Sequence, residues 1–233
     1  MPLDINNVVI KTSLTSCFGS HFKKVEGAVE FIDELAKEAE EISLKPGEYV
    51  FQENDKSDYV YIPETGSIML ERSTASGSRQ IFAFLFTGNL LGLSEHAHYS
   101  FSAKTLTNSV VIRITKQMMK DVFNKYPAVA HRYHDVTAHI LSLILDQLFI
   151  MGQKSAHQRL AHFLLDMQHR LGHGTHKFFL PMSRQDIADY LGMSIETASR
   201  GFSKLKADGL IKIESNYQIT VLEMPKLLAY AEG

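Results

Sequence analysis

The sequence predicts an α+β fold, in which a β jelly roll is followed by one long helix and a C-terminal winged helix-turn-helix. Three observations carry this prediction. Short β-rich runs separated by glycine turns occupy residues 42–114. A stretch without glycine or proline follows Pro127 and extends to Gly152. Residues 183–209 read SRQDIADYLGMSIETASRGFSKLKADG, the pattern of two short helices joined by a tight turn at Gly192.

Composition limits the classes to which the chain can belong. Of 233 residues, 45% are hydrophobic and 21% are charged, as in ordinary soluble domains. No apolar run approaches the roughly 20 residues that span a bilayer, and no secretory signal is visible. A single cysteine, Cys17, excludes an internal disulfide framework and fits a reducing compartment. We therefore expect a cytoplasmic protein without membrane contact.

Charge is unevenly divided along the chain. Residues 1–152 carry 14 lysines and arginines against 18 aspartates and glutamates, whereas residues 153–233 carry 10 against 8. The C-terminal part is therefore mildly basic, although the whole chain has a net charge of −2. This balance permits contact with nucleic acid without establishing it.

The first half of the chain divides into an arm and a roll. Residues 1–25 show little periodicity and are expected to form an N-terminal arm. Residues 26–126 are expected to form the β-roll domain, beginning with a short helix that ends near Ala39 and closing with another after Lys116. The expected strands are Tyr49–Phe51, Tyr59–Ile62, Ser67–Leu70, Gln80–Phe86 and Val110–Ile114.

A long helix is expected over residues 127–152, with apolar residues in a near-heptad stripe. Such a stripe fits packing on a partner helix, so we expect a homodimer, with burial inside one monomer as the alternative. The expected dimer-interface residues are Val136, Ile140, Leu143, Ile144, Leu148 and Met151. Gly152 interrupts the helical pattern and is the candidate hinge.

The winged helix-turn-helix is expected within residues 153–233. An amphipathic helix over residues 153–171 and a strand at 178–180 precede the motif. The residues spaced to face one core of the motif are Ile187, Leu191, Ile195, Ala198, Phe202 and Leu205. The β-rich runs 210–213 and 218–221 flank Ser215-Asn216 and predict a hairpin wing.

The second helix of the motif carries polar residues opposite its apolar face. Glu196, Ser199 and Arg200 are three and four positions apart and therefore share one face. An arginine can bind O6 and N7 of guanine, a glutamate can accept from a base amine, and a serine can contact a base edge. We predict that these residues contact DNA bases. For Glu196, a capping role or an ion pair with Arg200 is the alternative.

Residues near the two helix starts are candidates for phosphate contact. Ser183 and Ser194 are the expected N-caps, and Asp186 completes a capping box with Ser183. Helix N-termini attract anions. The predicted phosphate contacts are Ser183, Arg184, Ser194, Thr197 and Lys204, with Lys206 as a further candidate. Solvated surface charge is the alternative for the three basic residues.

The order of jelly roll, long helix and winged helix-turn-helix resembles the catabolite-activator/fumarate-nitrate-reductase (CRP/FNR) superfamily of bacterial transcription regulators. The run LKPGEYVF at 44–51, with residues 59–62 and 66–68, resembles its cyclic-nucleotide-binding roll. Residues 158–161 and 183–205 resemble the DNA-binding domain of its FNR and FixK branch, whose Glu-x-x-Ser-Arg motif matches Glu196 to Arg200. The resemblance implies a homodimeric activator that binds a TTGA-like palindrome in double-stranded DNA and acts with RNA polymerase.

The familiar inputs of this superfamily are not visible in the sequence. Gly88-Asn89 stands where cyclic-AMP-binding members carry Gly-Glu, and residues 94–102 contain no arginine for the cyclic phosphate. Cys17 alone cannot supply the four thiolates of an iron–sulfur cluster. We therefore expect no cofactor. Haem, a redox-reactive Cys17 and control by the protein's abundance are the alternatives.

Histidines and catalytic motifs add no second function. The histidines in the roll loop and near the long helix lack zinc spacing and are expected to lie at the surface or in hydrogen bonds: His96, His98, His131, His134 and His139. No nucleophile elbow, P-loop, metal-hydrolase motif or carboxylate pair indicates an enzyme. A regulatory subunit that uses its winged domain for protein contacts is the other class, and Arg200 with Lys204 argues against it.

Overall fold

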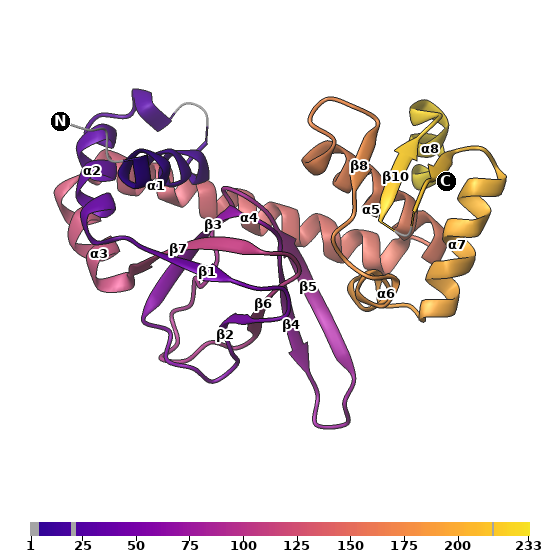
Figure 1. Ribbon diagram of the computed structural model, residues 1–233, viewed down its shortest axis with the longest axis horizontal. Coiled ribbons are helices and arrows are strands. Elements are labelled where there is room, and N and C mark those ends of the chain that lie inside the picture. Colours follow the sequence, from indigo (N-terminus) through magenta and orange to yellow (C-terminus); the bar gives the residue numbers. More distant parts are fainter. Residues whose placement is uncertain (1–4, 20–21, 216) are drawn as a thin grey trace. The chain divides into compact units, whose positions relative to one another are not determined.

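The computed structural model describes residues 5–19, 22–215 and 217–233. Its contacts divide the chain into two compact units, shown with their elements in Figure 1. The N-terminal unit contains residues 1–76 and 82–142, and the C-terminal unit contains residues 77–81 and 143–233. The division therefore falls inside the long helix, whereas the sequence places domain boundaries after residues 126 and 152.

Helices begin the N-terminal unit, where the sequence predicts an arm over residues 1–25. Helix α1 is Ile5–Cys17, a 3-10 turn η1 is Phe22–Lys24, and helix α2 is Ala28–Glu38. Leu14, Phe18 and Phe31 are buried in one core cluster, and the rings of Phe18 and Phe31 meet edge-on at 5.6 Å. The arm prediction was wrong, because tertiary packing stabilises a helix whose own periodicity is weak.

Within the described residues, seven strands form the roll in two sheets. They are β1 Glu40–Leu44, β2 Tyr49–Phe51, β3 Tyr59–Thr65, β4 Ile68–Ser73, β5 Arg79–Leu85, β6 Ser102–Thr105 and β7 Ser109–Thr115. One sheet has the order β1-β7-β3 and the other β2-β6-β4-β5. Late strands thus pair between early ones, which is the topology of the predicted jelly roll.

Two helices follow the roll, α3 (Lys116–Lys125) and α4 (Pro127–Gln153). Thr115 caps α3 by accepting a hydrogen bond from the backbone N–H of Met118. Among the described residues, α4 alone is long and apolar enough to cross a membrane, judged by length and composition only. The sequence contains no continuous apolar run of that length, because polar residues interrupt the apolar stretch of α4.

The C-terminal unit contains the predicted winged helix-turn-helix. Its elements are α5 Ala156–Leu171, β8 Lys177–Phe179, α6 Arg184–Leu191, α7 Ile195–Ala207, β9 Ile211–Ile213, β10 Gln218–Val221 and α8 Met224–Glu232. Helix α5 packs against α7 and α8, and α6 packs against α7. Strands β8, β10 and β9 pair in that order, so β9 and β10 form the predicted wing. Asn216, predicted in its turn, lies outside the described residues.

Candidate DNA-binding surface

Serine caps fix the starts of both helices of the motif. The Ser183 hydroxyl accepts from the N–H of Asp186 at 3.1 Å, and Oδ2 of Asp186 accepts from the N–H of Ser183 at 2.9 Å. The Ser194 hydroxyl accepts from the N–H of Thr197 at 3.2 Å. The predicted capping roles of Ser183, Asp186 and Ser194 are therefore confirmed. Each cap satisfies amides that the first helical turn leaves without partners.

Gly192 ends α6 at the turn between the two helices. Its φ of +58° lies in the left-handed region, where glycine carries no Cβ penalty. A Cβ at this position would also lie 2.8 Å from Cε of Met151. The turn therefore depends on glycine for both conformation and space.

Helix α7 presents a buried face and an exposed face. Ala198, Phe202 and Leu205 are buried, whereas Glu196, Ser199, Arg200 and Lys204 are exposed. Ile195, which the sequence places in the core, is instead 37% exposed. The prediction failed because Ile195 is the first residue of α7, where the side chain lies beside the turn. The exposed part of Ile195 is an apolar surface next to Glu196 in the sequence, which the periodicity did not reveal.

The polar residues on α7 interact locally. Arg200 donates from Nη2 to Oγ1 of Thr197 at 3.2 Å, and the hydroxyls of Thr197 and Ser194 are 3.2 Å apart. A hydrogen bond from Ser194, followed by a backbone hydrogen bond and the charge of Arg200, lowers the pKa of Glu196. Glu196 is thus an acceptor at neutral pH. The capping alternative and the DNA-contact prediction are compatible, because Glu196 remains exposed.

Arg184 is held between the two helices of the motif. Its guanidinium lies 3.3 Å from the centroid of the Phe202 ring, a cation–π contact. Burial lowers the pKa of Arg184 to about 10, so the group stays charged at neutral pH. Nη1 is buried without a hydrogen-bond partner in the described part of the chain. Arg184 is therefore a cation held in place at the start of α6. The alternative, that Arg184 is a freely solvated surface charge, does not fit this environment.

Residues 77–81, which group with the C-terminal unit, brace α6. Arg79 donates from Nε to Asp189 at 2.7 Å and from Nη2 to Asp186 at 2.5 Å. The side chain of Gln80 donates to the backbone carbonyl of Asp189 at 2.9 Å. The two aspartate side chains are only 12% and 13% exposed. Arg79 thus neutralises two nearly buried carboxylates on α6. No pattern in the sequence predicts this role.

Comparison with known proteins agrees with this geometry. Residues 41–126 match the cyclic nucleotide-binding domain family, and residues 158–230 match the Crp-like helix-turn-helix domain family. The transcriptional activatory protein AadR of Rhodopseudomonas palustris is 35% identical over 184 residues, covering 78% of this chain and 77% of that protein. The chain belongs to the CRP/FNR family of transcription regulators.

Further relatives place the chain in the FixK-like branch of CRP/FNR regulators. The nitrogen fixation regulation protein FixK of Rhizobium meliloti is 32% identical over 181 residues, covering 78% of this chain and 82% of that protein. The structure of FixK2 from Bradyrhizobium japonicum superposes with a TM-score of 0.78 at 31% identity, covering 82% of this chain and 96% of that one. The Glu196 to Arg200 motif and the α6–α7 geometry therefore belong to a DNA-binding helix-turn-helix.

The long helix of this CRP/FNR chain exposes apolar side chains. Among the predicted interface residues, Leu143, Ile144 and Leu148 are more than half exposed, Leu148 at 63%. Val136 packs on the core of the N-terminal unit. Met151 accepts a hydrogen bond at its Sδ from Nη1 of Arg159, at 3.8 Å. Three further residues are exposed although the heptad pattern did not include them: Leu141, Leu145 and Phe149.

Gly152 does not interrupt α4. The helix continues to Gln153, and α5 begins at Ala156 after Ser155 caps it in a capping box with Gln158. The break in the helical path therefore comes at Lys154 and Ser155, after the predicted hinge. The Ser-x-x-Gln pattern at 155–158 is a capping signal from which this boundary could have been predicted.

Aromatic side chains fill the core of the roll in this CRP/FNR chain. The ring of Phe51 stacks on Tyr99 at 3.9 Å and on Tyr61 at 5.5 Å. The Tyr99 hydroxyl donates to the Tyr59 carbonyl at 2.6 Å. His96 and His98 are exposed, and no cluster of three metal-binding side chains occurs among the described residues. These aromatic contacts pack the core of the roll.

Cys17 lies at the end of α1, with its thiol in a hydrogen bond. Sγ donates to the Leu14 carbonyl at 3.1 Å, and burial raises the pKa of the thiol to about 12. The thiolate is the reactive form of cysteine. This environment therefore opposes the redox-reactive alternative for Cys17.

Proposed function

We propose that the chain is a cytoplasmic homodimer that binds a TTGA-like palindrome and activates transcription with RNA polymerase. The observation that carries the proposal is the exposed face of α7, where Glu196, Ser199 and Arg200 project while Ala198 and Phe202 anchor the helix in its core. An anchored helix with a polar outer face suits the major groove. The names of the relatives, which include activators, support the direction of control.

Base contacts follow from the chemistry of the three side chains. Arg200 has two parallel donors for O6 and N7 of guanine, and Glu196 accepts from the amine of cytosine or adenine. Ser199 lies between them on the same face. Ile195, exposed at the start of α7, adds an apolar surface for a thymine methyl group.

Phosphate contacts surround this base-reading face. Ser183 and Arg184 lie at the start of α6, whereas Ser194 and Thr197 lie at the start of α7. Lys204 is exposed two turns along α7, where Asp208 accepts its hydrogen bond at 3.0 Å. These groups would fix the register of α7 on the duplex without reading sequence.

The homodimer would form along α4. Exposed Leu143, Ile144 and Leu148 would lose contact with water by packing on a second copy of the helix, which the hydrophobic effect favours. A membrane-spanning role fits less well, because Asp146 lies within this stretch and a charge at the bilayer centre is costly. Two DNA-binding units would then meet successive major grooves about 34 Å apart. Lys154 and Ser155, which separate α4 from α5, would provide the hinge between the two helices.

We propose that the signal sensed by the protein, if there is one, is neither cyclic AMP nor the oxidation of an iron–sulfur cluster. Residues 94–102 offer no arginine, and Cys17 is a single, half-buried cysteine whose thiol pKa is raised by burial. Control by abundance is the simplest alternative, and haem bound in the roll is the competing one. An absorbance spectrum of the purified protein separates them, since bound haem gives a Soret band.

Fluorescence anisotropy tests the DNA-binding proposal. Arg200→Ala should weaken binding to a TTGA palindrome by about 1–3 kcal/mol and relax selectivity at one base pair. Lys226→Ala is the matched control, because Lys226 is exposed on α8 and pairs only with Glu223 at 3.7 Å among the ion pairs described. Equal affinity and selectivity for parent and Arg200→Ala would refute the base-contact assignment. Failure of the parent to prefer any DNA would favour a regulatory subunit.

Sedimentation equilibrium tests the dimer. Leu148→Glu should shift the protein toward monomer, because it places a charge on the exposed apolar surface of α4. Leu228→Glu, on α8, changes an exposed leucine outside the proposed interface and serves as the control. A monomeric parent, or an undisturbed Leu148→Glu dimer, would contradict the α4 interface.

A further inference from the structure

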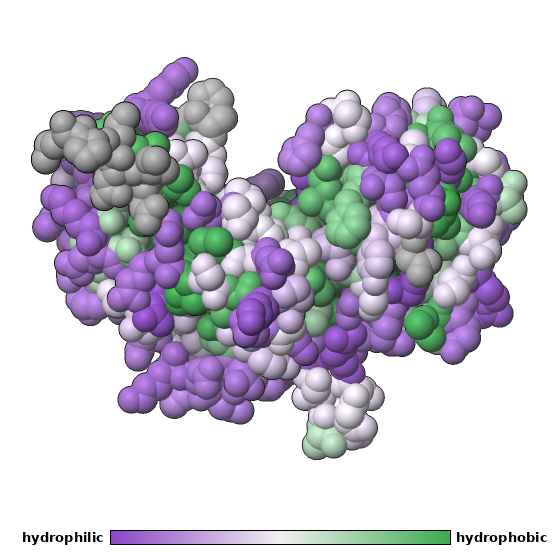
Figure 2. Space-filling model, in the orientation of Figure 1, coloured by the Kyte–Doolittle hydropathy of each residue, from purple (hydrophilic) through white to green (hydrophobic). Residues whose placement is uncertain are grey.

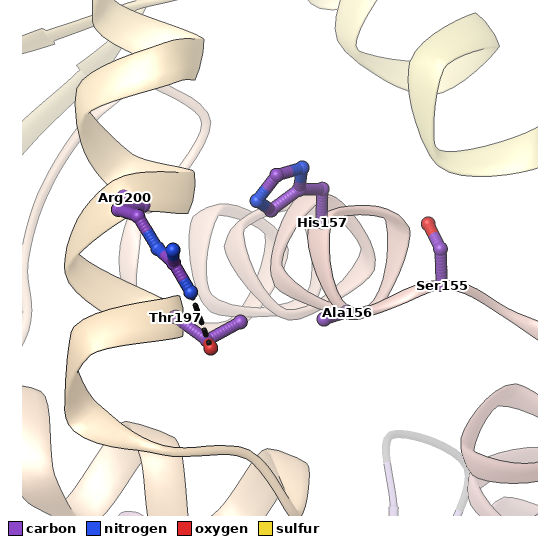
Figure 3. A pocket seen from close by; sticks show the side chains of 5 residues that line it. All are labelled: Ser155, Ala156, His157, Thr197 and Arg200. Carbon is purple, nitrogen blue, oxygen red and sulfur yellow. Dashed lines mark hydrogen bonds between the residues drawn. The ribbon is translucent and has the colours of Figure 1, made fainter.

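An open cleft lies between the start of α5 and the base-reading helix. Its lining residues are Ser155, Ala156, His157, Thr197 and Arg200. Figure 3 shows Thr197 and Arg200 on one helix, and Ser155, Ala156 and His157 on the facing segment around the same open space. The cleft therefore continues the proposed DNA-binding face from α7 onto α5.

Close packing places His157 against α7. A Cβ at Gly201 would lie 2.7 Å from Cδ2 of Leu160 and 3.3 Å from Cδ2 of His157. Glycine inside a helix costs about 1 kcal/mol relative to alanine, and this close approach explains why it is present. Gly201 directly follows Arg200. The His157 imidazole therefore lies beside the same turn of α7 as Arg200, the residue proposed to contact guanine.

The cleft collects positive charge when His157 is protonated. Arg200 is the permanent cation in its lining, and the imidazole makes no hydrogen bond within the described part of the chain. An imidazole is the side chain that ordinarily changes charge between pH 5 and 8. The cleft therefore offers an anion one fixed cation and one that depends on pH.

Most acidic groups on the elements packed around α5 have basic partners. The exception on α7 is Glu196, which hydrogen-bonds with Ser194 and lies one turn before Arg200, whose charge lowers the pKa of its carboxyl group. Asp208, the C-cap of α7, pairs with Lys204 at 3.0 Å, and on α6, Asp186 and Asp189 pair with Arg79. On α8, Glu232 accepts from Lys154 at 3.2 Å and lies 3.8 Å from His162. Glu214, which follows β9, pairs with Lys177 of β8. The residues that line the cleft include Arg200 and no carboxylate among those described, so the charged neighbour that His157 meets there is a cation.

We propose that His157 is a proton-dependent ligand for a DNA backbone phosphate, so that acidification strengthens operator binding. The inference rests on the proposed DNA-binding function and adds a means of regulating it. A phosphate beside the ring favours the imidazolium, so complex formation takes up a proton and affinity rises as pH falls. Protonation adds one cation–phosphate contact, which should steepen the dependence of log affinity on log salt by about 0.9.

Anisotropy titrations of the full chain against a TTGA-palindrome duplex, between pH 5.5 and 8.0, test the proposal. The parent should bind about fivefold to tenfold more tightly at the acidic end. The reason is that uptake of one full proton on binding raises the affinity about tenfold for each pH unit of acidification. His157→Gln should lose most of this pH dependence. His157→Lys should bind tightly throughout the range, with the steeper salt dependence at every pH. His169→Gln, which removes an exposed histidine from the same helix, should behave like the parent.

The outcomes separate this inference from the function on which it rests. Selective binding with the same pH dependence in parent and His157→Gln overturns the role of His157 and leaves the proposed function intact. If selective binding by the parent does not change with pH, the role of His157 is likewise overturned and the proposed function is left intact. Absence of selective binding at every pH overturns both. Thermal melting of each variant identifies loss of folding, and His157→Lys provides an independent test if His157→Gln unfolds.

Discussion

Replacing Gly201 with alanine probes the packing that positions the base-reading helix. A methyl group at this position would lie 2.7 Å from Cδ2 of Leu160, which is fully buried and cannot turn toward solvent. Overpacking a core in this way costs about 1–3 kcal/mol. Alanine's greater helix propensity returns about 0.5–1 kcal/mol. The difference predicts that Gly201→Ala lowers the free energy of unfolding by about 1 kcal/mol, within a range of about 0–2.5 kcal/mol.

Gly152→Ala is the matched control, because Gly152 is also helical and nothing lies within 4 Å of its added Cβ. That variant should gain about 0.5–1 kcal/mol, the propensity difference without the clash. Urea unfolding monitored by circular dichroism measures both changes. Gly201→Ala should also weaken selective DNA binding, since α7 must move away from α5. If Gly201→Ala were as stable as Gly152→Ala, the proposed close packing against Leu160 and His157 would be refuted.

The remaining predictions concern the bracing of α6, the helix caps and the thiol. Arg79→Met should reduce stability by about 1–3 kcal/mol in urea, because Asp186 and Asp189 lose a charged donor; an unchanged midpoint would contradict the brace. Ser194→Ala should cost about 1 kcal/mol in the same assay, whereas Ser194→Asp should keep the cap and the stability. At pH 8 the Cys17 thiol should react with Ellman's reagent only slowly until urea unfolds the chain, because burial raises its pKa to about 12 and thiolate is scarce below that pH. Fast reaction of the folded protein would restore the redox alternative.

Local patterns predicted the caps and the two faces of α7. Ser183, Asp186 and Ser194 act on amides within three residues, so their spacing in the sequence is sufficient. Ala198, Phe202 and Leu205 recur with helical periodicity and are buried as expected. Ile195 shares that periodicity but is exposed. Periodicity assigns a face, and the first turn of a helix can extend beyond the core that covers this face.

Contacts between distant residues escaped prediction. Arg79 reaches Asp186 across more than 100 positions, and no periodicity links an arginine in a hairpin with carboxylates on a later helix. The position of His157 beside Gly201 likewise depends on how α5 packs on α7. Helix α1 was missed for the same reason, since its stability comes from Leu14 and neighbouring side chains in a shared core.

Figure 2 shows a surface with mixed hydropathy, in which hydrophilic residues cover most of the visible face and hydrophobic residues form smaller patches. On this face, hydropathy by itself therefore does not single out a ligand site among the coloured residues. The exposed apolar residues of α4 are informative because they lie along one helix, from Leu141 to Phe149. Their clustering supports an interface, whereas scattered leucines elsewhere require no explanation.

The interior of the roll argues against a buried cyclic phosphate. A buried phosphodiester would need a charged donor within hydrogen-bond distance. Lys116 lies 5.6 Å from the centroid of the Tyr99 ring, but its ammonium already donates to the Ser94 carbonyl at 2.7 Å. Burial raises the pKa of Tyr99, which remains neutral and donates to Tyr59. The aromatic stack thus satisfies its own polar atoms and stabilises the roll by packing. His157 changes charge within the DNA-binding surface itself, so its effect on affinity requires no signal from the roll.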